Sequence, residues 1–141
     1  MPTAYLTRTV QFCAAHRYFR PEWSDARNTE TFGACASPHG HGHTYTCQVT
    51  VRGRTDPLTA MVVDLVALDR ILHEEVVARY DHRHLNLDAP EFAYGRTVPT
   101  GEALCVEIWR RVAPRLPSGC ALAAVRVREE PALWAEYRGE E

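Results

Sequence analysis

The chain contains no lysine, and all sixteen of its basic side chains are arginines. Schiff-base catalysis and the phosphate-binding P-loop both need a lysine amine, so the sequence excludes both. Without that amine, cleavage of a carbon–carbon bond beside an oxygen function requires a metal ion to polarise the substrate. The net charge is only −2, whereas a nucleic-acid-binding protein would be expected to carry a clustered basic surface.

No apolar run is long enough to cross a membrane, and the N-terminus lacks the charged and then apolar layout of a signal peptide. The cysteines are odd in number and form no disulfide framework, so we expect a cytoplasmic protein with reduced thiols. Cys35 lies in a polar loop, and the other four lie in apolar segments and are expected in the core: Cys13, Cys47, Cys105 and Cys120. The length of 141 residues predicts one domain over residues 1–141.

Alternation of apolar and polar residues predicts four strands, over residues 4–16, 41–53, 120–129 and 132–138. The first two are expected to pair antiparallel. One face of the third is expected to carry Ala121, Ala123, Val125, Val127 and Glu129. Residues 17–40 are punctuated by proline and glycine and predict a long loop, and loops of that length are often functional.

Apolar residues at intervals of three and four predict two helices between the second and third strands. The first has Asp64 as its N-cap, ends before Asp81 and buries Leu65, Leu68, Leu72 and Val76. The second has Thr100 as its N-cap, is stopped by Pro117 to Gly119 and buries Leu104, Ile108, Val112 and Leu116. The order ββααββ predicts an α+β fold, an antiparallel four-stranded sheet with two helices on one face. The uncovered face and the unpaired edge strands favour a homo-oligomer.

Three histidines share the inward parity of the first two predicted strands. His41 and His43 alternate at the start of the second strand, and His16 ends the apolar row of the first. Three imidazoles with an open fourth position are typical of a catalytic zinc site, so we predict that these residues bind Zn²⁺. An alternative register for the metal ligands uses Cys35, His39 and His41.

Three further positions carry chemical groups whose roles the residues alone leave open. Glu129 ends an apolar row, where it would bind an arginine or a ligand with two parallel N–H donors, or would be exposed at the end of the strand. Asp81 and His82 form either a polar helix terminus or a carboxylate–imidazole pair for proton transfer. Cys35 near a zinc ion would have a lowered pKa and would act as a base or nucleophile, or as a fourth ligand.

An ordered set of motifs covers nearly the whole chain. Its members are Phe12–Arg17, Phe32–Cys35, Gly40–Tyr45, Asp81–Asn86, Pro99–Glu102, and Glu129 with Trp134–Tyr137. On these motifs the sequence resembles the 6-pyruvoyl-tetrahydropterin synthase / 6-carboxytetrahydropterin synthase family. The chain departs from the family pattern at Glu130, where threonine is usual, and in the long insertion between His16 and Cys35.

The resemblance implies the T-fold, and a homohexamer built as a dimer of trimers with active sites at subunit interfaces. It implies that His16, His41 and His43 bind zinc, which favours this register over the one with His39. It also implies roles for five further residues. Cys35 is the catalytic thiol, Asp81 and His82 relay protons, Glu129 anchors the pterin's amino-pyrimidine edge, and Thr100 helps to hold the pterin.

The family substrate is 7,8-dihydroneopterin triphosphate, whose triphosphate Arg17 or Arg27 would meet. The short chain and all-arginine usage favour a bacterial protein. We therefore expect formation of 6-carboxy-5,6,7,8-tetrahydropterin, with release of acetaldehyde and triphosphate, for queuosine-type biosynthesis. The alternative is a 6-pyruvoyl-tetrahydropterin synthase, as in the pyruvoyl-forming relatives that share the eight-residue spacing from Cys35 to His43. A second alternative is a zinc- and pterin-binding relative without catalysis.

Overall fold

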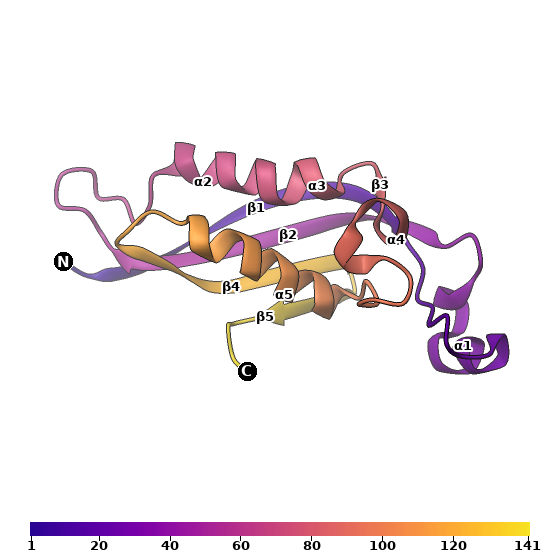
Figure 1. Ribbon diagram of the computed structural model, residues 1–141. Helices are drawn as coiled ribbons and strands as arrows, with labels where there is room; N and C mark the ends of the chain where they lie inside the picture. The colour runs from indigo at the N-terminus through magenta and orange to yellow at the C-terminus, as the bar shows by residue number, and fades with distance from the viewer.

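Two long strands form the centre of the sheet, β1 (Thr3–His16) and β2 (His41–Arg54). The computed structural model describes residues 1–141, and in it these strands pair antiparallel along their whole length, as the alternation predicted (Figure 1). On β1 the side chains of Phe12 and Ala14 face the core, while Cys13 between them is exposed on the opposite face. The expectation that Cys13 is a core residue is therefore wrong, because it has the outward parity of the strand.

The sheet has five strands in the order β3-β1-β2-β4-β5, one more than the sequence predicts. The bounds of the other two long elements are Cys120–Glu130 for β4 and Leu133–Tyr137 for β5, which pair antiparallel. The additional strand, β3, is only Arg83–His84 and pairs parallel with the end of β1. Two residues are too few to produce an alternating pattern, so periodicity cannot reveal such a strand.

A β-bulge divides β4 into two halves. Thr50 of β2 faces Ala124 while the next residue, Val51, faces Leu122, so Ala123 is the extra residue. As a result Leu122 and Val125 both point into the core although they are three residues apart, and Ala121 is exposed. The predicted inward row is therefore correct from Val125 onward and out of step before the bulge.

One face of the sheet is covered by two helical segments (Figure 1). The first comprises α2 (Leu65–Leu72), a π-helical turn (His73–Val77) and α3 (Ala78–Tyr80). Asp64 caps it as predicted, since its Oδ1 accepts the N–H of Val66 at 2.9 Å. The predicted apolar stripe is buried except for its first residue: Leu68, Leu72 and Val76 are inside, and Leu65 is 37% exposed.

The second helix, α5 (Gly101–Val112), packs on β4 and β5. Thr100 caps it, because its Oγ1 accepts the N–H of Ala103 at 3.1 Å. The helix ends earlier than predicted and tightens into a 3₁₀ turn (Ala113–Arg115) that contains a proline, which cannot donate a helical hydrogen bond. The short α4 (Leu85–Asp88) and a 3₁₀ turn (Pro90–Phe92) precede it.

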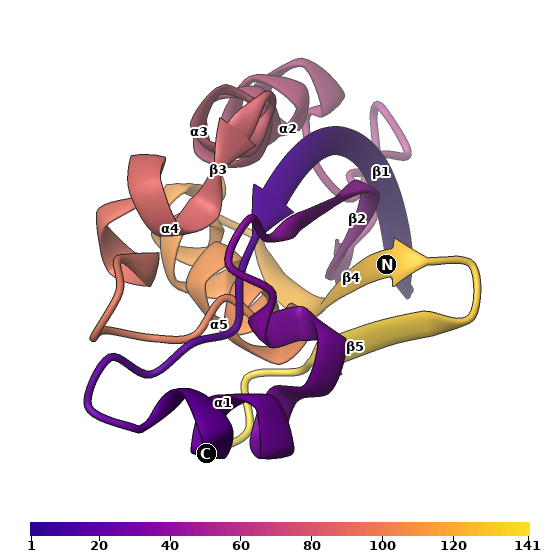
Figure 2. The ribbon, with the colours of Figure 1, turned by 90° about the vertical axis from the view of Figure 1, so that its right-hand side faces the viewer.

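The predicted loop over residues 17–40 contains a helix, α1 (Asp25–Phe32), followed by a 3₁₀ turn (Gly33–Ala36). Ser24 caps α1 by accepting the N–H of Arg27 at 3.1 Å. Asn28 is the only residue of α1 that is buried, so the helix has no apolar stripe that could have revealed it. In Figure 1 this segment projects beyond the end of the sheet where β1 gives way to β2. In Figure 2, which shows the molecule from that end, α1 lies below the strands.

The core lies between the covered face of the sheet and the two helical segments. Phe12 of β1 and Tyr45 of β2 stack at its centre, with ring centroids 4.7 Å apart. Cys47 and Cys105 are buried in this core, as predicted, and Cys120 is half-buried. No helix in the structure is both long enough and apolar enough to cross a membrane.

Candidate metal and substrate site

The antiparallel register of β1 and β2 brings the three predicted ligands together. His16 lies directly opposite His41, and His43 lies two residues along the same face. His16 Nε2 and His41 Nε2 are 3.2 Å apart, and one ring nitrogen from each of the three histidines lies within 4.8 Å of the others. Neither Cys35 nor His39 belongs to this group, and His39 is exposed. The geometry therefore favours the register with His16, His41 and His43.

His16 is held in the orientation that a metal ligand needs. Its Nδ1 lies 2.9 Å from the carbonyl oxygen of Pro99. Because a carbonyl can only accept, Nδ1 carries the proton and Nε2 turns its lone pair toward His41. Burial lowers the pKa of His16 to about 4, against the bond to Pro99, which raises it, and the neighbouring His41 and His43 lower it further, so the ring is neutral at physiological pH. Neutral imidazole is the form that binds metal ions.

His43 gives an independent test of whether these residues fit a metal ion. Its Nε2 is buried and has no hydrogen-bond partner. The nearest acidic oxygen, Glu129 Oε2, is 3.8 Å away, which is too far for a good hydrogen bond. A buried polar atom without a partner is costly, and a metal ion shared with His16 and His41 would satisfy it. The three side chains therefore fit a metal ion.

Glu129 is buried beside the histidines, with 8% of its surface exposed. It is the extra residue of a second bulge, because Arg128 pairs with Trp134 whereas Glu130 pairs with Leu133. Bulges often re-aim a side chain next to a site. No arginine contacts the carboxylate, so the salt-bridge alternative that the sequence left open is wrong.

A cavity of about 230 Å³ opens beside Glu129. Thr100 and Gly101 at the start of α5 line it, as do Tyr18 and the half-exposed Trp134. The structure thus brings the predicted substrate residues Glu129 and Thr100 into one pocket, adjacent to the histidines. The amino terminus of α5 gives this wall a partial positive charge.

Tyr18 is the pocket residue that the sequence analysis missed. Its hydroxyl donates to Glu129 Oε1 at 3.1 Å, and its ring packs edge-on against His16 at 4.9 Å. Burial and the Glu129 charge raise the pKa of Tyr18 far above its usual value, so the hydroxyl stays protonated and donates. Phe12, Ala14 and His16 occur at every second residue, and Tyr18 continues this alternation. The alternation is the sequence feature from which Tyr18 could have been predicted.

Cys35 lies in the 3₁₀ turn after α1 and is half-buried. Its carbonyl oxygen accepts the Tyr18 N–H at 2.9 Å, which ties the thiol segment to the pocket. Burial and the Glu129 charge raise the pKa of the Cys35 thiol. The surrounding protein groups therefore do not lower the pKa of Cys35. The lowered pKa predicted from the sequence requires the positive charge of a bound metal ion.

Asp81 and His82 form the predicted pair, but not beside Cys35. Asp81 Oδ1 accepts the N–H of Cys13 at 2.8 Å, and its Oδ2 lies 3.5 Å from His82 Nε2. The His82 side chain is 83% exposed and borders a shallow pocket that includes Cys13 and Thr44 of the uncovered face. Within one chain, no hydrogen bond joins this pair to Cys35.

The two arginines proposed to bind the triphosphate contact other groups of the chain instead. Arg17 donates through Nε to the carbonyl of Ala36 at 2.9 Å, and its guanidinium covers the ring of Phe19. The guanidinium of Arg27 lies 4.1 Å from the ring centroid of Trp23. Neither lines the pocket beside Glu129.

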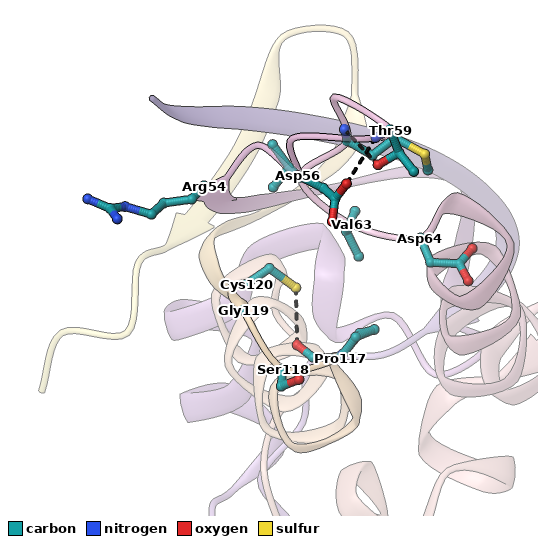
Figure 3. A pocket seen from close by; sticks show the side chains of 11 residues that line it. Arg54, Asp56, Thr59, Val63, Asp64, Pro117, Ser118, Gly119 and Cys120 are labelled. Carbon is teal, nitrogen blue, oxygen red and sulfur yellow. Dashed lines mark hydrogen bonds between the residues drawn. The ribbon is translucent and has the colours of Figure 1, made fainter. Parts of the chain in front are cut away.

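A separate cavity of about 490 Å³ lies at the opposite end of the sheet, between residues 54–64 and 117–120 (Figure 3). Its polar groups serve their own loops. Asp56 Oδ1 accepts the N–H groups of Leu58 and Thr59, and Cys120 Sγ donates to the carbonyl of Pro117 at 3.3 Å. No histidine borders it, so the candidate site is the one at the histidine end.

Comparison with known proteins matches this chain to one family. A family profile described as "6-pyruvoyl tetrahydropterin synthase" matches residues 5–140. The 6-pyruvoyl tetrahydrobiopterin synthase of Drosophila melanogaster is 41% identical over 138 residues, covering 98% of this chain and 81% of that protein. The 6-carboxy-5,6,7,8-tetrahydropterin synthase of Bacillus subtilis (strain 168) is 32% identical over 138 residues, covering 94% and 84%. The solved structure of Caenorhabditis elegans 6-pyruvoyl tetrahydropterin synthase superimposes with a TM-score of 0.91 at 35% identity, covering 99% and 98%.

Proposed function

The chain belongs to the 6-pyruvoyl tetrahydropterin synthase family, and on this basis we propose that it is a zinc-dependent lyase acting on 7,8-dihydroneopterin triphosphate. The observation that carries the proposal is the juxtaposition of two sites. A histidine triad suited to a metal ion lies against a pocket whose buried carboxylate, Glu129, contacts no arginine. A pterin offers such a carboxylate two parallel N–H donors from its amino-pyrimidine edge.

The product we propose is 6-pyruvoyl-tetrahydropterin, formed by elimination of the triphosphate. Relatives named for this reaction are 41% and 35% identical to the chain, against 32% for the relative named for the carboxy-forming reaction. The carboxy-forming reaction expected from the sequence rested on chain length and arginine usage, which are not features of the site. It remains the second candidate because the Bacillus subtilis relative matches along most of the chain.

The residues have distinct proposed tasks. His16, His41 and His43 would hold zinc, which when bound supplies a Lewis acid that acidifies the hydroxyls of the substrate side chain. Glu129 accepts the N–H groups of the base and so orients the side chain toward the triad, with Thr100 bordering the same pocket. Cys35 Sγ and His82 Nε2 move protons on the side-chain carbons, and Asp81 orients His82.

A test of the product uses purified zinc-loaded protein incubated with 7,8-dihydroneopterin triphosphate and analysed by mass spectrometry. We expect the mass of 6-pyruvoyl-tetrahydropterin together with inorganic triphosphate. Carboxytetrahydropterin with acetaldehyde would assign the second candidate function instead. Bound but unchanged substrate would contradict both reactions and would support a binding protein without catalysis.

The placement of His82 predicts that the site is completed by a second copy of the chain, within a homo-oligomer such as a dimer of trimers. Cys35 lies beside Tyr18 and Glu129, whereas His82 lies over Cys13 on the uncovered face, so one chain does not place the two groups together. The uncovered face and the largely unpaired outer edge of β1 are available for such contacts.

Mixed oligomers test this arrangement. Cys35→Ala and His82→Ala proteins are each expected to lose nearly all turnover. Co-expression should restore about a quarter of wild-type turnover, since random assembly pairs an intact thiol with an intact imidazole in that share of shared sites. Simple mixing without subunit exchange is the control. Persistent inactivity of fully exchanged oligomers would show that both groups must come from one chain.

A further inference from the structure

Tyr18 is the point at which three parts of the proposed active site meet. Its backbone N–H binds the carbonyl of Cys35 at 2.9 Å, its ring packs edge-on against the His16 ring, and its hydroxyl binds Glu129 at 3.1 Å. The ring also contacts Phe32 edge-on, at 5.9 Å between centroids. These contacts fix the position of the phenol from several sides, so its hydroxyl is a preorganised donor.

The Glu129 carboxylate depends on that donor. The Tyr18 hydroxyl makes the only hydrogen bond to either carboxylate oxygen. On the opposite side, Oε2 lies 3.8 Å from the unpartnered Nε2 of His43. The Glu129 carboxylate packs closely against the start of α5. A Cβ atom added to Gly101 would lie only 3.3 Å from Glu129 Oε1. The Tyr18 hydroxyl thus fixes Oε1, while Oε2 faces His43 without a hydrogen bond.

We infer that Tyr18 is a positioning residue that sets the selectivity of the pocket for a 2-amino-4-oxo pyrimidine edge. The inference rests on the proposed function, in which Glu129 accepts two parallel N–H groups from the base. A carboxylate accepts both only when its plane is aligned with the ring of the ligand. The hydroxyl occupies one lone pair of Oε1 and leaves the remaining acceptor sites of the two oxygens for the base.

The test compares two ligands that lack the triphosphate. Pterin presents the 2-amino group and N3–H, whereas lumazine has a carbonyl at position 2 and presents only N3–H on that edge. Zinc-loaded wild-type protein and the Tyr18→Phe variant are titrated with each ligand, followed by ligand fluorescence or calorimetry. Because a hydrogen bond to a charged group is removed, we expect pterin to bind the variant about tenfold more weakly, with lumazine nearly unaffected. In turnover, KM should rise while kcat changes little.

Tyr80→Phe is the matched control. The Tyr80 hydroxyl also donates to a carboxylate, Glu91 Oε1, at 2.8 Å, and it is buried outside the pocket. Its removal should alter thermal stability without changing the preference for pterin over lumazine. A Tyr18→Phe protein that keeps the full wild-type preference would overturn the inference and leave the proposed function intact. A wild-type protein that binds no pterin would refute the proposed function itself.

A double-mutant cycle separates positioning from packing. If Tyr18 acts through the carboxylate, Tyr18→Phe should cause no further loss of pterin binding in a Glu129→Gln background. Additive losses would show that Tyr18 affects the ligand by another route and would contradict the inference. Unfolding midpoints of all four proteins identify any loss that arises from a damaged fold.

Discussion

Replacing Cys35 with alanine is expected to lower turnover of 7,8-dihydroneopterin triphosphate by about 10²- to 10⁴-fold, the usual contribution of a general acid or base. The thiol makes no hydrogen bond in the structure, and the bond that ties this turn to the pocket is made by the Cys35 carbonyl, which alanine retains. The fold, the metal site and the pocket should therefore survive while the proton transfer is lost. Steady-state kinetics, zinc content and the affinity for pterin distinguish these effects.

Cys120→Ala is the control for this experiment. It also removes a half-buried thiol, but one that binds Pro117 at the far end of the sheet (Figure 3). Its turnover should match the wild type. If Cys35→Ala retained normal turnover, the assignment of Cys35 as the proton-transferring thiol would have to be abandoned, whatever the product.

His41→Ala is expected to lose the metal and, with it, all measurable turnover. His41 is the direct neighbour of His16 across the strand pair, and its removal leaves two imidazoles to hold the ion. Loss of a residue that only hydrogen-bonds to a metal ligand already weakens metal binding by about 10- to 100-fold. Loss of a ligand itself should therefore weaken binding by more than that. Metal content after dialysis gives the result directly. Zinc should also raise the unfolding temperature of the wild type and not that of the variant.

The matched control here is His39→Ala, since His39 lies two residues earlier in the chain but is exposed and outside the triad. It should retain zinc and turnover. The reverse outcome, with metal lost from His39→Ala and kept by His41→Ala, would favour the register of ligands that includes Cys35. The metal content of both variants is measured at the same zinc concentration. The two ligand registers predict opposite results for this one measurement.

Much of this site could be predicted from the sequence because its ligands stand on regular strands. The alternation that ends in His16 and the alternation that begins at His41 and His43 each define a face, and antiparallel pairing brings those faces together. Asp64 and Thr100 marked the helix starts because capping depends on a local side chain.

The remaining features depend on contacts that no local pattern records. Helix α1 was missed since it buries almost nothing, and β3 since it pairs over only two residues. Sequence order places Asp81 and His82 near the end of a helix, but their position over the uncovered face depends on hydrogen bonds to Cys13. Tyr18 acquires its importance only from Glu129, which is 111 residues away in the chain.

The bulge at Ala123 gives β4 a tolerance to changes in length. The half from Ala124 to Arg128 is aligned by its own pairing with Thr46–Thr50, independently of how many residues lie before it. Loss of Ala123 would leave Leu122 and Ala124 as consecutive residues opposite Val51 and Thr50, and would not turn Glu129 to the other face. The half of β4 before the bulge can therefore gain or lose a residue while the carboxylate keeps its orientation. A deletion between Ala124 and Arg128 has no such buffer, because each step of one residue inverts the strand's two faces.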